Sequence, residues 1–198
     1  MSTPRRGRPR SDQAHQAVLG AARELIVDIG YDKITVEGIA ARAGVAKQTV
    51  YRWWPAKSAI VAEALLSGYA ATPSAALADT GDLAADLRSW LGAQFSAIGQ
   101  PGVAASLRSL AAVTAASDED AARLQARLTT PFRDLLLARL AAGIGTGQVR
   151  TDTDLDAVAD MLLGTIVYRC LTRSRQITQT DADGVVDALL QPLVPPSG

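Results

Sequence analysis

Apolar residues recur through most of the chain at intervals of three and four positions, which is the spacing of an amphipathic α-helix. In the first such segment, Val18 and Ile26 fall on one face of a helix. Ser11 is a suitable N-cap before this segment, and Gly30 is a suitable end after it because glycine adopts the left-handed conformation without strain. The pattern therefore predicts a helix over residues 11–29.

The same spacing, interrupted by glycine, proline and short polar stretches, predicts eight more helices. They cover about 36–43, 47–54, 56–71, 82–98, 103–116, 118–142, 154–173 and 180–191. The pattern does not contain several β-branched segments separated by turn dipeptides, as a β-sheet would require. We therefore expect an all-α protein of about nine helices, in which alanine-rich helices follow Thr72-Pro73.

Charge is divided unevenly along the chain, although the 198 residues contain 20 basic and 20 acidic groups and have no formal net charge. Residues 1–60 carry 10 basic and 5 acidic groups, a net charge of +5. Residues 61–198 carry 10 and 15, a net charge of −5. A basic N-terminal part is suited to binding nucleic acid, because phosphate neutralisation supplies much of the affinity in such complexes.

Several classes of protein are disfavoured by what the sequence lacks. A single cysteine, Cys170, allows no intrachain disulfide, and with His15 as the lone histidine we expect no metal site and no cofactor. No converging acid–base or nucleophilic groups are recognisable, so we do not expect an enzyme. The sequence also shows neither a secretory signal nor an apolar stretch of about 18 residues, which predicts a soluble, cytoplasmic protein.

The segment 36–54, VEGIAARAGVAKQTVYRWW, has the spacing of a helix-turn-helix. Ala40 is small where the two helices approach each other, and Gly44 occupies the turn, where a positive φ is expected. Val45 and Val50 supply apolar contacts that set the angle between the helices. Since two helices alone would be marginal, the helix over 11–29 is expected to complete their core.

The exposed face of the second of these helices has side chains suited to DNA. Glutamine can bind adenine through two hydrogen bonds, arginine can bind guanine in the same way, and threonine offers a hydroxyl and a methyl group. The residues expected to read bases are Gln48, Thr49 and Arg52. Those expected to anchor phosphates are Thr35, Lys47, Tyr51 and Lys57, and Trp53 could do either.

A basic arm, MSTPRRGRPR, precedes the first helix. Its arginines are Arg5, Arg6, Arg8 and Arg10. Beside a helix-turn-helix, such an arm is expected to enter the adjacent minor groove. The alternative is a solubilising tail without DNA contacts.

At these residues the sequence resembles the TetR family of bacterial transcription regulators, over about residues 11–61. The resemblance rests on Gly30-Tyr31, Thr35, Ile39-Ala40, Ala43-Gly44-Val45, Thr49, Tyr51, Trp54, Lys57 and Ile60. It implies a flexible arm over 1–10, a three-helix DNA-binding domain over 11–55, and a helical ligand-binding and dimerisation bundle over 56–198. Three departures are Ala46, which leaves the recognition helix without a side-chain N-cap, Trp54, which replaces the usual Phe, and Gly38, which lowers helix propensity.

The helix near residues 155–171 is apolar around most of its axis, which predicts burial on more than one side. One side can face its own bundle and the other a second subunit, so that two helices from each subunit form a four-helix interface with twofold symmetry. The residues expected there are Leu163, Val167, Leu171, Val185, Val186 and Leu189. The alternative is a central helix in a monomer.

Large side chains of the expected C-terminal bundle are candidates to line a ligand pocket, although any could be ordinary core. They are Trp90, Phe95, Phe132, Met161 and Tyr168. The scarcity of mid-helix charges favours an apolar or weakly polar ligand. The sequence thus predicts a homodimeric repressor that binds a palindromic operator and is released by a small molecule. The alternatives are a ligand-responsive activator and a non-specific architectural DNA-binding protein.

Overall fold

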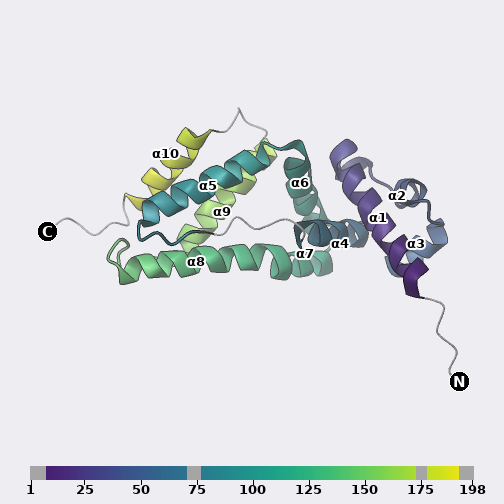
Figure 1. Ribbon diagram of the computed structural model, residues 1–198, viewed down its shortest axis with the longest axis horizontal. Coiled ribbons are helices and arrows are strands. Elements are labelled where there is room, and N and C mark those ends of the chain that lie inside the picture. Colours follow the sequence, from purple (N-terminus) through teal and green to yellow (C-terminus); the bar gives the residue numbers. More distant parts are fainter. Residues whose placement is uncertain (1–7, 71–76, 173–177, 192–198) are drawn as a thin grey trace, which may run out of the picture. The chain divides into compact units, whose positions relative to one another are not determined.

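The computed structural model describes residues 8–70, 77–172 and 178–191, and their regular elements are all helical (Figure 1). The expected all-α fold class is therefore confirmed. The α-helices are α1 (Arg8–Asp28), α2 (Val36–Ala43), α3 (Lys47–Trp53), α4 (Lys57–Ala70), α5 (Leu83–Ile98), α6 (Pro101–Ala116), α7 (Asp118–Leu124), α8 (Thr130–Gly145), α9 (Leu155–Thr172) and α10 (Gln179–Leu190).

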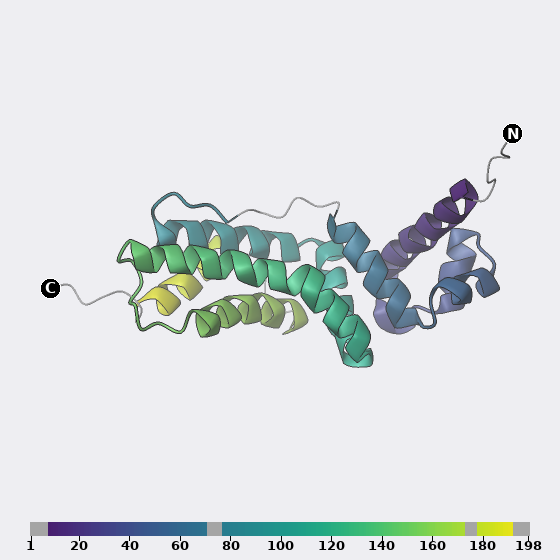
Figure 2. The same ribbon diagram turned by 90° about the horizontal axis from the view of Figure 1, so that it is seen from below.

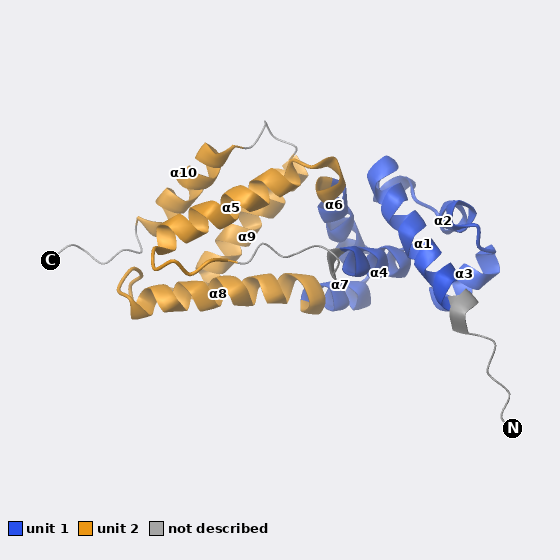
Figure 3. Ribbon diagram, viewed as in Figure 1, with its two compact units in different colours: residues 1–72, 105–125 blue, residues 73–104, 126–198 orange. Residues whose placement is uncertain are grey.

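The chain forms two compact units (Figure 3). Unit 1 comprises residues 1–72 and 105–125, and unit 2 comprises residues 73–104 and 126–198. Helix α4 belongs to unit 1 because it packs along α1, and α7 belongs there because it contacts α4.

In unit 1, α1 packs against both α2 and α4, and α2 packs against α3. The core takes one fully buried apolar side chain from each of these helices: Val18, Ile39, Val50 and Ile60 are all 0% exposed. These residues lie on the helix faces that the apolar spacing predicts. Ile29 follows the last residue of α1 and is 42% exposed, so it lies outside this core.

Helix α2 begins and ends at the predicted residues, because both of its ends are fixed by local chemistry. The Thr35 side chain accepts a hydrogen bond of 3.0 Å from the amide of Gly38, and Gly44 has the left-handed conformation with φ 65°. Gly38 is accounted for by the same cap, since a Cβ atom at this position would lie 3.2 Å from the Thr35 hydroxyl oxygen. Glycine therefore leaves room for the capping side chain.

The structure differs from the sequence prediction over residues 118–142, where one helix was expected. Helix α7 ends at Leu124, a π-helical turn covers Gln125–Thr129, and α8 then begins. Pro131 lies in the first turn of α8, where its missing amide hydrogen costs no helical hydrogen bond. At the other end of the chain, α1 begins three residues before the predicted N-cap Ser11.

In unit 2, α5 contacts α8, α9 and α10, and α8 also packs on α9 (Figures 1 and 2). Much of the core between these helices is aliphatic: Leu87, Leu91, Leu140, Leu162 and Val186 are all 0% exposed. Helix α5 is thus the central helix of the unit.

An ion pair is buried in this unit between Arg139 of α8 and Asp86 of α5, which are 5% and 3% exposed. The guanidinium donates two hydrogen bonds to one Asp86 oxygen, at 2.9 and 2.7 Å. Burial would raise the pKa of Asp86, but hydrogen bonds from Thr80 and Arg139 together hold it below its usual value. The carboxylate is therefore charged at neutral pH, and its contribution to stability is lost only as the pH falls below the usual aspartate range.

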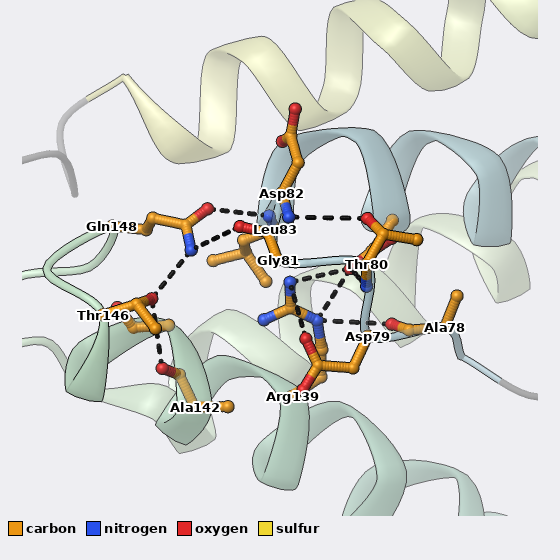
Figure 4. Close-up of polar contacts among 12 residues, drawn as sticks. Ala78, Asp79, Thr80, Gly81, Asp82, Leu83, Arg139, Ala142, Thr146 and Gln148 are labelled. Carbon is orange, nitrogen blue, oxygen red and sulfur yellow. Dashed lines mark hydrogen bonds and ion pairs between the residues drawn. The ribbon is translucent and has the colours of Figure 1, made fainter.

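Further hydrogen bonds near this ion pair hold the segment before α5 against the end of α8 (Figure 4). Gln148 accepts a hydrogen bond of 2.8 Å from the amide of Leu83 and donates one of 3.0 Å to the carbonyl of Gly81. Gly143 permits the close approach, because a Cβ atom there would lie 2.8 Å from the Leu83 side chain. The start of α5 is therefore fixed by contacts with residues more than 50 positions away in the sequence.

We predict that Arg139→Met lowers the melting temperature of the full chain by about 5–10 °C, because Asp86 is left charged and buried without its partner. The double change Arg139→Met with Asp86→Leu should recover most of this loss, since no buried charge remains. Arg150→Met is the matched control, because Arg150 pairs with Asp152 on the exposed surface. Equal, small shifts for Arg139→Met and Arg150→Met would contradict a stabilising role for the buried pair. Thermal unfolding followed by circular dichroism measures all of these variants.

Candidate nucleic-acid interface

Helix α3 presents one polar face and one buried face. Val50 is fully buried, whereas the side chains of Lys47, Gln48, Tyr51 and Arg52 are exposed. Two further candidates on this helix, Thr49 and Trp53, are half-buried. The structure thus brings all six predicted side chains of α3 onto or beside the exposed face.

The end of α3 is fixed to α1 and α4 through Trp54, which is 3% exposed. Its indole nitrogen donates a hydrogen bond of 2.7 Å to Glu63 of α4. The His15 ring of α1 stacks on the indole, with 4.6 Å between the ring centroids, and its Nε2 lies 3.1 Å from the other Glu63 oxygen. Three helices therefore meet at one tryptophan, which satisfies its polar atom without exposing it.

The exposed side chains at the end of α3 are ordered by their neighbours. Trp53 packs edge-on against both His15 and Trp54, with ring centroids 5.7 and 5.5 Å apart. The Arg52 guanidinium lies 5.8 Å from the centre of the Trp53 ring, within range of a cation–π interaction. These contacts restrict the directions in which the side chains of Arg52 and Trp53 project from α3.

At the start of α3, Lys47 pairs with Glu37 of α2, and its ammonium lies 5.5 Å from the centre of the Tyr51 ring. The hydrogen bond between the two charged groups raises the pKa of Lys47 and lowers that of Glu37, so both are charged at neutral pH. Sequence reasoning did not single out Glu37. A carboxylate in the first turn of α2 was visible in the sequence, but its contact with the next helix depends on the turn between them.

Lys57 is half-buried in the first turn of α4. Its ammonium donates a hydrogen bond of 3.0 Å to the carbonyl of Tyr31 and lies 4.1 Å from the centre of the Tyr31 ring. Burial, followed by the charges of Asp120 and Asp32, raises the pKa of the Tyr31 phenol, which is therefore neutral. Thr35, the remaining phosphate candidate, is exposed and uses its hydroxyl oxygen to cap α2.

Of the four arginines of the predicted basic arm, only Arg8 and Arg10 belong to the described residues. Arg5 and Arg6 lie outside the described residues. The backbone of Arg8 and Arg10 belongs to the first turns of α1. Residues 8–10 of the arm expected over 1–10 are therefore helical, and the rest of that arm lies outside the described residues.

The side chains expected to line a ligand pocket do not all face the interior of unit 2. Trp90 and Phe95 of α5 are 4% and 2% exposed, and Phe132 of α8 is half-buried. Met161 and Tyr168 of α9, by contrast, are 53% and 64% exposed. The prediction that these two line an internal pocket is therefore wrong for the single chain, because they lie on the outer face of α9.

The residues expected at a dimer interface divide in the same way. Val167 and Leu171 of α9 are exposed, each by 47%, and they share this outer face with Met161 and Tyr168. The partly exposed members are Leu163, Val185 and Leu189. Val186 is 0% exposed, so it belongs to the core beneath α10 and was wrongly included.

Among the described residues, no helix has both the length and the apolar character needed to cross a membrane. In the same part of the chain, no three His, Cys, Asp or Glu side chains gather into a group that could hold a metal ion.

Comparison with known proteins settles the family. Residues 18–64 match the family described as bacterial regulatory proteins, tetR family, and residues 77–189 match the tetracyclin repressor-like C-terminal domain. The chain belongs to the TetR family of bacterial transcription regulators. The resemblance found in the sequence is thereby confirmed, and the chain is a DNA-binding regulator rather than an enzyme.

Several relatives are similar over most of the chain. The helix-turn-helix transcriptional regulator YdeS of Bacillus subtilis is 31% identical over 89% of this chain and 87% of its own length. The DNA-binding transcriptional repressor TetR of Mycobacteroides abscessus is 26% identical, over 94% and 97%. Among solved structures, the TetR family regulator SCO0332 is 28% identical and has a TM-score of 0.65, over 92% and 100% of the two chains.

We predict that Trp54→Ala destabilises the chain by about 3–5 kcal/mol, because it removes the largest side chain that joins α3 to α1 and α4. Trp54→Phe should cost less than about 1.5 kcal/mol, since it loses the hydrogen bond to Glu63 but keeps most of the apolar volume. Urea unfolding followed by circular dichroism measures both. Trp53→Ala serves as the control, because this neighbouring side chain is only half-buried. The account fails if Trp54→Ala and Trp53→Ala have the same stability.

Proposed function

We propose that the protein is a homodimeric repressor that binds a palindromic operator and is released when a small molecule binds in unit 2. The observation that carries the proposal is the exposed face of α3, whose polar and basic side chains are held outward by the buried Val50 and Trp54. A helix anchored in this way can enter the major groove without rearranging. The charge of the first 60 residues, net +5, favours the approach of this unit to DNA. Because its proposed target is DNA, we infer that the protein works in the cytoplasm.

In the proposed complex, Gln48, Thr49 and Arg52 read base edges, because their side chains can form the hydrogen bonds that distinguish base pairs. The contacts that fix the register would go to phosphates. We assign these to Thr35, Lys47, Tyr51 and Lys57, with Trp53 at either type of contact and the arm arginines Arg5, Arg6, Arg8 and Arg10 near the minor groove.

Dimerisation is supported by the outer face of α9. Met161, Val167, Tyr168 and Leu171 are exposed large apolar side chains on one helix, which favours a protein–protein contact. Leu163 of α9 and Val185 and Leu189 of α10 are partly exposed, and we assign them to the same interface. Two such helices from each subunit form a four-helix interface with twofold symmetry.

Control by a ligand is supported by the large apolar interior of unit 2. Trp90, Phe95 and Phe132 remain as candidate pocket residues, and they suit an apolar or weakly polar molecule. Release of DNA requires that the ligand bind more tightly to a conformation that does not fit the operator. The similarity to the repressor TetR of Mycobacteroides abscessus favours repression, and a ligand-responsive activator is the alternative.

We predict that selection of bound duplexes from a random DNA pool yields a palindrome whose half-sites are separated by about one helical turn or more. The twofold symmetry arises because each subunit presents one α3. The matched control is Leu171→Glu, which places a charge on the apolar face of α9 and leaves α3 unchanged. This variant should select single half-sites and bind them more weakly.

Two results would contradict the proposal. A pool that is bound without enrichment of any sequence would favour a non-specific architectural DNA-binding protein. A palindrome selected equally well by the wild-type protein and by Leu171→Glu would place the dimer contact elsewhere than on α9.

A further inference from the structure

The ion pair between Glu37 and Lys47 lies within the DNA-binding surface rather than beside it. Glu37 is in the first turn of α2, two residues after the cap residue Thr35, and Lys47 is the first residue of α3. More than half of each side chain is exposed, 55% for Glu37 and 53% for Lys47. A carboxylate is therefore fixed at the N-terminal end of α3, where recognition helices approach base edges most closely.

Fold stability accounts for only part of the placement of an acidic side chain here, because a carboxylate in the first turn of α2 gains only about 0.3–1 kcal/mol from the helix dipole. An exposed ion pair contributes little to stability, because water screens the charges and both side chains lose freedom. The pair has a larger effect on DNA binding. Attraction to DNA of any sequence comes from basic groups that neutralise phosphates, and Lys47 is already neutralised by Glu37. The carboxylate itself is repelled by phosphates.

The major groove offers a partner that can replace Lys47. Cytosine and adenine expose amino groups there, and a carboxylate is a suitable acceptor for the amino group of cytosine in particular. When Glu37 faces such an amino group, Lys47 is released and can bind a phosphate. When Glu37 faces only hydrogen-bond acceptors of the bases, its carboxylate is desolvated or repelled. Glu37 then remains paired with Lys47.

We propose that Glu37 is a specificity-determining residue of the DNA-binding surface, which weakens binding to unrelated DNA and accepts a hydrogen bond from a base amino group in the operator. This inference rests on the proposed function, because it requires an operator that is bound in a fixed register. It assigns a role to a residue outside the sets predicted to read bases and to bind phosphates.

The test compares Glu37→Gln with the wild-type protein on two duplexes of equal length, the one selected from the random pool and an unrelated sequence, between 50 and 200 mM salt. Glutamine keeps the shape and removes the charge. Affinity for the unrelated duplex should rise about threefold or more, and its salt dependence should steepen by about one phosphate contact per subunit. Affinity for the selected duplex should not rise, so the ratio of the two affinities should fall about fivefold or more.

Two further variants make the result specific to this position. Glu24 pairs with Arg42, which lies at the opposite end of α2 from Glu37. Glu24→Gln therefore removes an equal charge away from this position and should leave the ratio of the two affinities unchanged. Glu37→Asp keeps the charge but shortens the side chain, so it should still bind unrelated DNA weakly while losing affinity for the selected duplex. Melting temperatures confirm that each variant is folded.

The proposal is overturned if Glu37→Gln strengthens binding to both duplexes by the same factor, because Glu37 would then only lower the overall attraction to DNA. It is also overturned if Glu24→Gln reproduces the loss of specificity. If the proposed function itself were wrong, the result would differ, because the wild-type protein would bind the two duplexes equally.

Discussion

The buried contact of Trp54 with α1 and α4 is the interaction on which the DNA-binding surface depends. Helix α3 has only seven residues, too few to be stable or to hold a direction alone. Val50 fixes its middle, and the hydrogen bond from Trp54 to Glu63, together with the stacked His15 ring, fixes its end. With the inner face held at these points, the outer face presents its polar side chains in one arrangement.

The two units differ in where their ion pairs lie and in what these pairs do. In unit 1, exposed charges pair between helices, as in the pairs of Lys47 with Glu37 and of Arg42 with Glu24, and Lys47 at the start of α3 can exchange its partner for DNA. In unit 2, the Arg139–Asp86 pair is buried and held by several hydrogen bonds, so it fixes the start of α5 against α8. Rigid packing around α5 provides a frame in which the apolar face of α9 remains exposed.

Local chemistry made unit 1 predictable from the sequence. The cap of Thr35, the left-handed Gly44 and the spacing of buried residues act over a few positions, and α2 was predicted at both ends. Contacts between helices were not predictable, because Glu37 and Glu63 reach partners that only the folded chain brings near. In unit 2 the periodicity located α9 and α10 but did not show which face meets α5. Met161, Tyr168 and Val186 were therefore assigned to the wrong environments.

Amide hydrogen exchange of the full chain, with and without the DNA duplex that it selects, tests the central claim most directly, namely that the outer face of α3 is the surface bound to DNA. The account predicts added protection on DNA binding in residues 35–38 and throughout α3, with little change in α5 and α8. Protection confined to unit 2, with exchange in α3 unchanged, would contradict it.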